Sequence, residues 1–292
     1  MRLELTDEQK AIQAVARDFA EKEVRPIAEA IDREARFPSE TVRRMGELGL
    51  MGIFIPEECG GSGGDAVAYA LAVEELARVC ASHAVIMSVN NSLYCEPVLK
   101  FGTPEQRQRF LAPYAAGQKL GCFSLTEPEA GSDATNQHVV ARREGDQYVI
   151  DGRKIFVTNG REAAAALVFA QTDRSKRSHG ISAFLVEKGT PGFTVVKTEE
   201  KLGIRAPDTA ELLFEGCRVP AAQTRQHPLR EISAEVQEEV ADAVGRRVGP
   251  PPDLLLRKPR RARLDAAEEV AQAIGAGRAE TVVHGPHHKP WR

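Results

Sequence analysis

The chain has 292 residues, which is enough for one large domain or two to three small ones. Hydrophobic residues make up 42% and charged residues 28%, a balance that is typical of globular proteins. The net charge of −3 gives no reason to expect nucleic-acid binding, and no apolar run reaches the roughly 18–20 residues needed to span a membrane.

The first 118 residues predict an all-helical domain. Thr6 can cap a helix that opens with two acids, which the helix dipole favours at that end, and apolar residues then recur at a spacing of three to four. Another helix is expected from Ser39, and a third over residues 65–80. The sequence Thr103-Pro-Glu-Gln has the pattern of a capping box with proline at the first helical position.

The next hundred residues predict short strands. Strand-like runs occupy 147–150, 154–158, 166–170, 182–186, 193–196 and 211–214, and turn signals rich in glycine, aspartate and proline separate them. Short strands at this spacing favour an antiparallel barrel or sandwich. We therefore predict an α+β fold with an N-terminal helical domain, residues 1–118, followed by an antiparallel β-barrel domain, residues 119–222.

The composition changes again beyond residue 222. All eleven Phe and all four Tyr lie before this point, and the only aromatic residue of the tail is Trp291. The tail also contains three consecutive prolines and a basic run at 257–263. Because such a composition supports little packed core, we expect residues 223–292 to form an atypical, poorly ordered tail. Within it, the periodicity of 229–244 and 264–274 is compatible with helices.

Two segments carry the residue types that a flavin site needs. They are Phe-Ser-Leu-Thr-Glu-Pro-Glu-Ala-Gly-Ser-Asp at 123–133 and Lys-Ile-Phe-Val-Thr-Asn-Gly at 154–160. A flavin ring must be held rigidly, with hydrogen bonds along its polar edge, and a strand edge with short hydroxyl side chains supplies these without bulk. Thr126 and Thr158 are such hydroxyls, and backbone can approach a ligand closely at Gly131. Taken alone, the two segments are also ordinary turn and strand sequences.

In their order, and behind a helical region, these two segments resemble the flavin-contacting segments of acyl-CoA dehydrogenases. Residues 56–63, 201–209 and 217–220 resemble further parts of that family, so the resemblance covers about residues 1–222. The resemblance implies an FAD-dependent oxidoreductase of fatty acid β-oxidation. Such an enzyme removes one hydrogen from each of C2 and C3 of an acyl-CoA and passes the electrons through FAD to an electron-transferring flavoprotein. Within this family of lipid metabolism, residues 88–94 and 100–106 look most like the corresponding segments of the short-chain, butyryl-CoA-type members.

The resemblance also implies which residues bind the cofactor. Thr126 is expected to bond the flavin ring edge, Phe156 to lie against the ring and Thr158 to donate near N5. Ser132 is expected to touch the acyl-CoA substrate as well, and no metal site is predicted. The full set of expected FAD contacts is Phe123, Ser124, Leu125, Thr126, Glu127, Pro128, Gly131, Ser132, Phe156, Val157 and Thr158.

The tail departs from the family pattern. In most members a C-terminal four-helix bundle carries the catalytic glutamate and much of a homo-oligomer interface. The tail does not resemble that bundle, so the catalytic residue stays unknown, and none of the tail acids is assigned as the base (Glu231, Glu235, Glu238, Glu239, Glu268, Glu269). Our hypothesis is a frameshift near residue 222. The alternative to a working dehydrogenase is a catalytically dead, truncated remnant or a module that binds FAD or acyl-CoA. A third possibility is that a separate subunit supplies the bundle and its glutamate.

Weaker signals favour no further function. Gly60–Gly64 lacks the spacing of a dinucleotide-binding or phosphate-binding loop, and the basic run 257–263 is typical of a solvated segment. Three histidines at 284, 287 and 288 have no carboxylate or cysteine spaced for a metal site. Five scattered cysteines and an N-terminus without signal-peptide features favour a cytoplasmic location. From the net charge and the absence of a long apolar run, we expect no nucleic-acid partner and no membrane partner.

Overall fold

The structure is a computed structural model that describes residues 4–226, with every side chain in that range except those of Arg177, Arg225 and Gln226. The predictions made for the tail lie outside the described residues. These are its helices at 229–244 and 264–274, its acids, its basic run and its histidines. No helix within residues 4–226 is long and apolar enough to cross a membrane.

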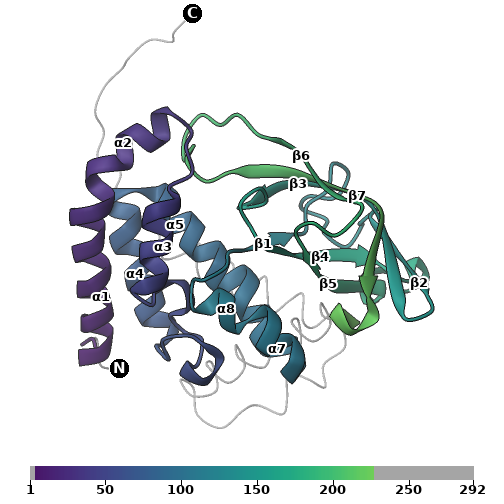
Figure 1. Cartoon of the computed structure of the whole chain (residues 1–292), viewed down its shortest axis with the longest axis horizontal. Helices are drawn as coiled ribbons and strands as arrows, with labels where there is room; N and C mark the ends of the chain where they lie inside the picture. The colour runs from purple at the N-terminus through teal and green to yellow at the C-terminus, as the bar shows by residue number, and fades with distance from the viewer. Residues whose placement is uncertain (1–3, 227–292) are drawn as a thin grey trace, which may run out of the picture. The chain divides into compact units, whose positions relative to one another are not determined.

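The first part of the described chain is helical, as predicted (Figure 1). Thr6 and Gln9 form a capping box at the first helix, and Thr103 and Gln106 form a second one, so both predicted helix starts are confirmed. The α-helices are α1 (Asp7–Phe19), α2 (Arg25–Arg33), α3 (Ser39–Glu47), α4 (Ala66–Val79), α5 (Ala81–Ser88), α6 (Glu96–Phe101), α7 (Pro104–Phe110) and α8 (Ala112–Ala115). Single π-helical turns, η1 (Ala20–Val24) and η4 (Val89–Cys95), and short 3-10 turns, η2 (Leu50–Gly52) and η3 (Glu57–Cys59), complete this part.

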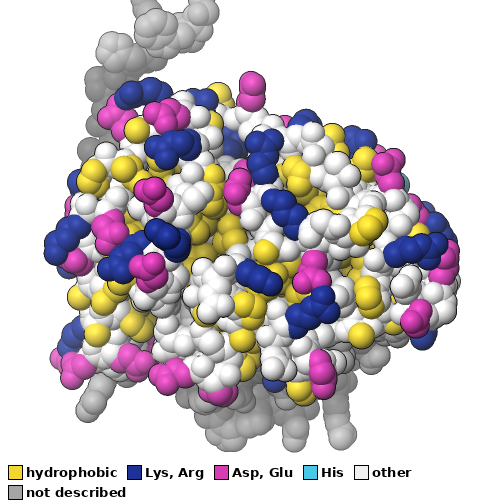
Figure 2. Space-filling view, viewed as in Figure 1, with side chains coloured by type: hydrophobic (Ala, Val, Ile, Leu, Met, Phe, Trp, Pro, Cys, Tyr) yellow, Lys and Arg dark blue, Asp and Glu magenta, His cyan; other side chains and the backbone are white. Residues whose placement is uncertain are grey.

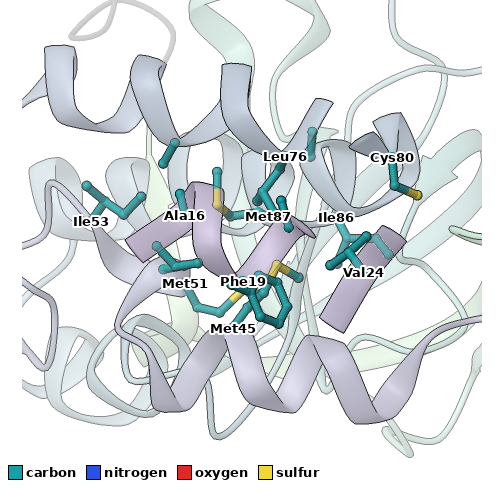
Figure 3. Close-up of a cluster of buried hydrophobic side chains, with 14 of the residues drawn as sticks. Ala16, Phe19, Val24, Met45, Met51, Ile53, Leu76, Cys80, Ile86 and Met87 are labelled. Carbon is teal, nitrogen blue, oxygen red and sulfur yellow. The ribbon is translucent and has the colours of Figure 1, made fainter. Parts of the chain in front are cut away.

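One apolar cluster holds the helices together (Figure 3). Phe19 of α1 and Leu76 of α4 are fully or almost fully buried in it. Three methionines at 45, 51 and 87 lie between them, and their flexible side chains suit the irregular space between helices. The helix predicted over 65–80 is confirmed as α4, and its buried residues belong to this core.

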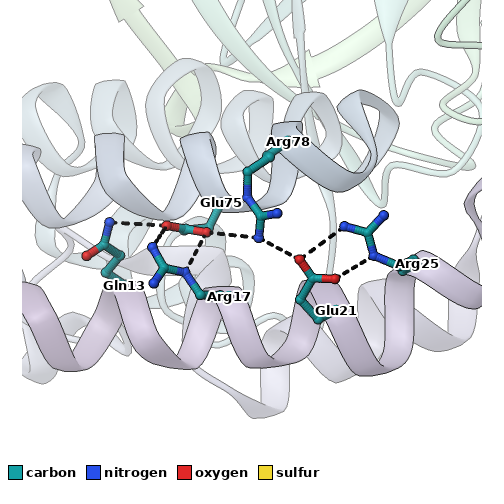
Figure 4. A network of polar contacts seen from close by, with 6 residues as sticks. All are labelled: Gln13, Arg17, Glu21, Arg25, Glu75 and Arg78. Carbon is teal, nitrogen blue, oxygen red and sulfur yellow. Dashed lines mark hydrogen bonds and ion pairs between the residues drawn. The ribbon is translucent and has the colours of Figure 1, made fainter.

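A polar network joins α1 to α4 on one side of that cluster (Figure 4). Glu75 is 3% exposed, and its carboxylate accepts hydrogen bonds from Arg17, at 2.5 and 3.0 Å, and from Gln13, at 3.1 Å. Arg78 bridges Glu75 to Glu21. The bonds from Arg17 lower the pKa of the Glu75 carboxyl, so this buried acid is charged and fully partnered.

Two buried asparagines in η4 tie the helical part together, and one of them also bonds to the sheet. The Asn91 side chain accepts from the backbone N–H of Ile53 at 2.8 Å and donates to two carbonyls. Asn90 donates to the carbonyl of Tyr114 and accepts from the N–H of Gly121, at 2.9 Å, where the first strand starts. The start of the sheet is thus fixed by a hydrogen bond from the helical part.

Residues 121–226 form one sheet with eight strands in the order β6-β7-β3-β2-β4-β5-β8, and β1 pairs beside β4 (Figure 1). All six predicted strand runs lie in strands, and two of them fuse into the long β3. The strands are β1 (Gly121–Ser124), β2 (Val140–Glu144), β3 (Gln147–Thr158), β4 (Ala165–Gln171), β5 (Ile181–Glu187), β6 (Phe193–Thr198), β7 (Thr209–Pro220) and β8 (Thr224–Gln226).

The prediction of an antiparallel barrel was wrong in its pairing. Strand β1 runs parallel to β4, with Gly121 opposite Ala165, and β2 also meets β4 in parallel. Parallel neighbours need a long connection, and the chain between β1 and β4 supplies one that contains the β2–β3 hairpin. The result is a curled, mixed sheet. Within the described residues, the two ends of the strand order, β6 and β8, are not paired with each other.

Candidate functional site

The two segments singled out in the sequence lie side by side. Strand β1 ends at Ser124, and the chain then leaves the sheet in a loop. The backbone N–H of Ile155 in β3 donates to the carbonyl of Thr126 in this loop, at 2.9 Å. A tight turn between Glu127 and Ala130, with backbone hydrogen bonds in both directions, follows at once. Segment 123–133 is thereby fixed against the end of β3.

The side chains of the first segment divide between core and surface. Ser124 and Glu127 are buried, at 0% and 2% exposure, whereas Pro128, Gly131 and Ser132 are exposed. Phe123, Leu125 and Thr126 are half-buried. Ser124 and Glu127 therefore lie beneath the surface of the segment, which is formed by the other predicted residues.

The second segment contains an irregularity that aims an aromatic ring outward. The register of β3 against β7 shifts between Lys154 and Val157, so that β3 carries one extra residue there. Phe156 lies in this bulge with a φ of 57°, in the left-handed region, and its side chain is 60% exposed. Val157 is buried at 1% exposure, and Thr158, opposite Thr209, is half-buried.

A buried ion pair lies directly beneath the two segments. Lys154 is 0% exposed, and its ammonium donates to the Glu127 carboxylate at 2.7 Å, to the Leu125 carbonyl at 2.8 Å and to Gln137 Oε1 at 3.1 Å. The Glu127 carboxylate also accepts the backbone N–H groups of His138 and Val139. Burial lowers the pKa of Lys154 to about 8, against the opposing effect of Glu127.

Sequence reasoning did not single out Lys154 by its burial, although a signal was present. Tyr148 and Ile150 are both buried, and alternation along β3 places Gly152 and Lys154 on the same face. A lysine in phase with buried strand residues indicates an internal ion pair, because an unpaired buried ammonium is strongly unfavourable.

The arrangement presents unused hydrogen-bonding groups around an exposed ring. Within residues 4–226, neither the Thr126 nor the Thr158 hydroxyl makes a hydrogen bond to another group. A side chain added at Gly131 would meet nothing within 4 Å, so the backbone there is open to a ligand. Beside Ser132, a polar hollow is lined by Asp133, Thr135, Asn136, Gln137, Gln171 and Arg174. A flat group with a polar edge fits these features.

Two histidines and the glycine-rich loop do not join this site. His83 is fully buried among the helices, and His138 is exposed and contributes its backbone N–H to Glu127. The Gly60–Gly64 loop is held by backbone bonds to residues 52–57. On the face shown in Figure 2, basic and acidic side chains are interspersed, so no extended patch of one sign is present on that face.

Comparison with known families decides what this arrangement belongs to. Residues 6–118 match the acyl-CoA dehydrogenase N-terminal domain, and residues 122–217 match the acyl-CoA dehydrogenase middle domain. The chain belongs to the acyl-CoA dehydrogenase family. The middle-domain match includes both segments of the candidate site, and no C-terminal domain of the family is detected.

Individual relatives agree with this assignment. The chain is 53% identical over 218 residues to the mitochondrial short-chain specific acyl-CoA dehydrogenase of Mus musculus, a match that covers 75% of this chain and 53% of that protein. It is similar to butyryl-CoA dehydrogenase from Megasphaera elsdenii, with a TM-score of 0.78, 36% identity and coverage of 95% and 78% of the two chains. It is also similar to a glutaryl-CoA dehydrogenase from Mycobacterium smegmatis in complex with FADH2, with a TM-score of 0.72, 36% identity and coverage of 76% and 56%. The chain thus spans about half the length of the curated relative.

Proposed function

We propose that this chain is the FAD-binding part of an acyl-CoA dehydrogenase that oxidises a short-chain acyl-CoA and delivers the electrons to an electron-transferring flavoprotein. The observation that carries the proposal is the hydrogen bond from Ile155 to Thr126, since it joins the two segments on which the flavin contacts are expected. The relatives named above support the short-chain substrate class. The domain boundaries at 118 and 222 remain part of the proposal.

The described residues fit a flavin ring. Thr126 and Thr158 offer hydroxyls without protein partners, and we assign them to the polar ring edge and to the region of N5. Phe156 offers an exposed aromatic face against which a flat ring can pack. The remaining predicted contacts, Phe123–Pro128, Gly131 and Val157, then shape the backbone around the ring. When bound, FAD would accept a hydride from the substrate.

The substrate side of the proposal rests on Ser132. This exposed residue lies at the rim of the polar hollow that starts at Asp133, so it can contact both the cofactor and an acyl-CoA. We assign no catalytic base within residues 4–226. The dehydrogenase reading therefore requires a base from elsewhere, while the alternative is a module that binds FAD or acyl-CoA without turnover.

We also propose a reducing compartment such as the cytoplasm. All five cysteines of the chain lie within the described residues, and all are free thiols. Four of them are buried, where they act as small apolar side chains. Free thiols persist where the surroundings are reducing, although a mitochondrial matrix would meet the same condition.

The test is a titration of the purified chain with FAD, followed by visible absorbance before and after anaerobic addition of butyryl-CoA. Bleaching of a bound flavin supports the dehydrogenase. A flavin that is retained but not bleached supports the binding module, and failure to retain flavin refutes the dehydrogenase and leaves, of the binding module, only one that binds acyl-CoA. The variant Thr158→Val should weaken FAD binding. The matched control Thr194→Val, an exposed threonine on β6, should not.

A further inference from the structure

The buried ion pair between Lys154 and Glu127 links the two candidate flavin segments. The ammonium of Lys154 receives its three acceptors from one continuous stretch, residues 125–137, although Lys154 itself belongs to β3. Glu127 extends this contact to the start of β2, since its carboxylate also accepts the backbone N–H groups of His138 and Val139. We name Lys154, Glu127 and Gln137 the internal anchor.

The anchor holds a stretch that has little other support. Between the end of β1 and the start of β2 the chain forms neither helix nor strand. The backbone bonds there are a turn between Glu127 and Ala130, a turn at Asp133, the bond that Thr126 accepts from β3 and, at the far end, the bond that Val139 accepts from Gln171 of β4. A loop with so few backbone bonds depends on side-chain contacts for a defined shape. The buried anchor supplies these contacts.

The anchor also lies next to strained backbone. Lys154 is the last regularly paired residue of β3 before the bulge, and Phe156, two residues on, has a left-handed φ of 57°. A left-handed conformation in a residue with a Cβ persists only when surrounding contacts hold it in place. Lys154 on one side and the pairing of Val157 with Ala210 on the other hold this bulge.

We propose that Lys154 is a positioning residue that fixes the loop of Thr126 against the bulge of Phe156 and so sets the affinity of the chain for FAD. The inference rests on the proposed function for its ligand. Lys154 itself is fully buried, so it acts on the ligand through the backbone of the two segments. Without it, Glu127 becomes a buried carboxylate that has lost its cationic partner, and the loop keeps only the backbone bond from Ile155 to Thr126 as a hydrogen bond to β3.

The first arm of the test needs no cofactor. Hydrogen–deuterium exchange is measured by mass spectrometry on the full chain, for Lys154→Met and for the double variant Lys154→Met/Glu127→Gln, which removes both charges. The matched control is Arg153→Met, because Arg153 is the preceding residue of the same strand and pairs with Glu211 of β7. We expect faster exchange of residues 124–139 in both Lys154 variants, and no such change in the control.

The second arm measures FAD affinity at a temperature at which far-UV circular dichroism shows every variant to be folded. We expect both Lys154 variants to bind FAD about tenfold more weakly, since small displacements of positioning groups have effects of this size or larger, and Arg153→Met to match the wild type. The double variant decides between positioning and stability. Because the double variant no longer buries an unpaired carboxylate, its melting temperature should recover, but its affinity for FAD should not.

Three results would overturn the inference. They are unchanged exchange at 124–139, wild-type affinity in Lys154→Met, and recovery of affinity in step with the melting temperature in the double variant. A wild-type chain that binds no FAD would refute the proposed function instead. In that case the exchange comparison still decides whether Lys154 fixes the two segments.

Discussion

One buried histidine should dominate the loss of stability at mildly acidic pH. His83 is fully buried, with Nε2 at 2.7 Å from Thr41 Oγ1 and Nδ1 at 3.3 Å from Cys80 Sγ. The Thr41 hydroxyl donates to the carbonyl of Pro38, so its oxygen accepts from Nε2–H of the ring. The Nδ1 atom then accepts from the Cys80 thiol. This neutral ring is satisfied on both sides, and a second ring proton would have no strong acceptor.

The size of the effect follows from the pKa of His83. Burial lowers this pKa from 6.5 to about 4. The unfolded chain takes up a proton as the pH falls below 6.5, but the folded chain does so only near pH 4, so falling pH favours unfolding across that window. The stability is fully present above the window. The difference between the unfolded and folded pKa values corresponds to about 3 kcal/mol of unfolding free energy, of which about 2 kcal/mol is already lost at pH 5.

The assay is urea unfolding followed by far-UV circular dichroism at about pH 7.5 and about pH 5, with the pH-dependent change compared within each variant. Between about pH 7.5 and about pH 5, the free energy of unfolding should fall by about 2 kcal/mol more in the wild type than in His83→Gln. The control His138→Gln, which alters an exposed histidine, should lose as much as the wild type. The reasoning is refuted if His83→Gln and the wild type show the same loss.

Two further substitutions test the buried contacts around η4. Gly121→Ala places a Cβ within 2.2–2.6 Å of the buried Tyr94 ring, so the free energy of unfolding should fall by about 2 kcal/mol in urea. An unchanged midpoint would contradict this packing. Asn91→Leu leaves the N–H of Ile53 and two carbonyls without their side-chain partner, so we expect a loss of about 3 kcal/mol by the same measurement. Asn136→Leu, at an exposed position, serves as its control.

The helical part and most strands could be predicted because their signals are local. The capping boxes at Thr6 and Thr103 depend on residues three positions apart, and both form as predicted. The parallel pairing of β1 with β4 could not be predicted in this way. Strand β1 has only four residues, and its direction is set by partners far away, namely the side chain of Asn90 and the edge of β4.

For the candidate site, the sequence identified the segments but not their shape. Motif resemblance assigned Thr126 and Thr158 to two flavin-contacting segments, and the bond from Ile155 to Thr126 brings these two segments together. The burial of Glu127 was not foreseen, since an acid in a turn normally faces water. Its partner is Lys154, 27 residues away, and no local pattern connects two residues at that separation.

At the bulge in β3, two residues of the candidate site differ from what packing and backbone preferences favour. With regular alternation after Lys154, residue 156 would face the core and residue 157 would face outward. The extra residue reverses this, so that Val157 fills the core and Phe156 is exposed in a left-handed conformation that glycine would adopt with less strain. Packing alone would favour glycine at 156 and an apolar residue such as methionine at 154. Since neither the core nor the sheet gains from an exposed strained aromatic ring above a buried charge, these two departures support a ligand at this point of the chain.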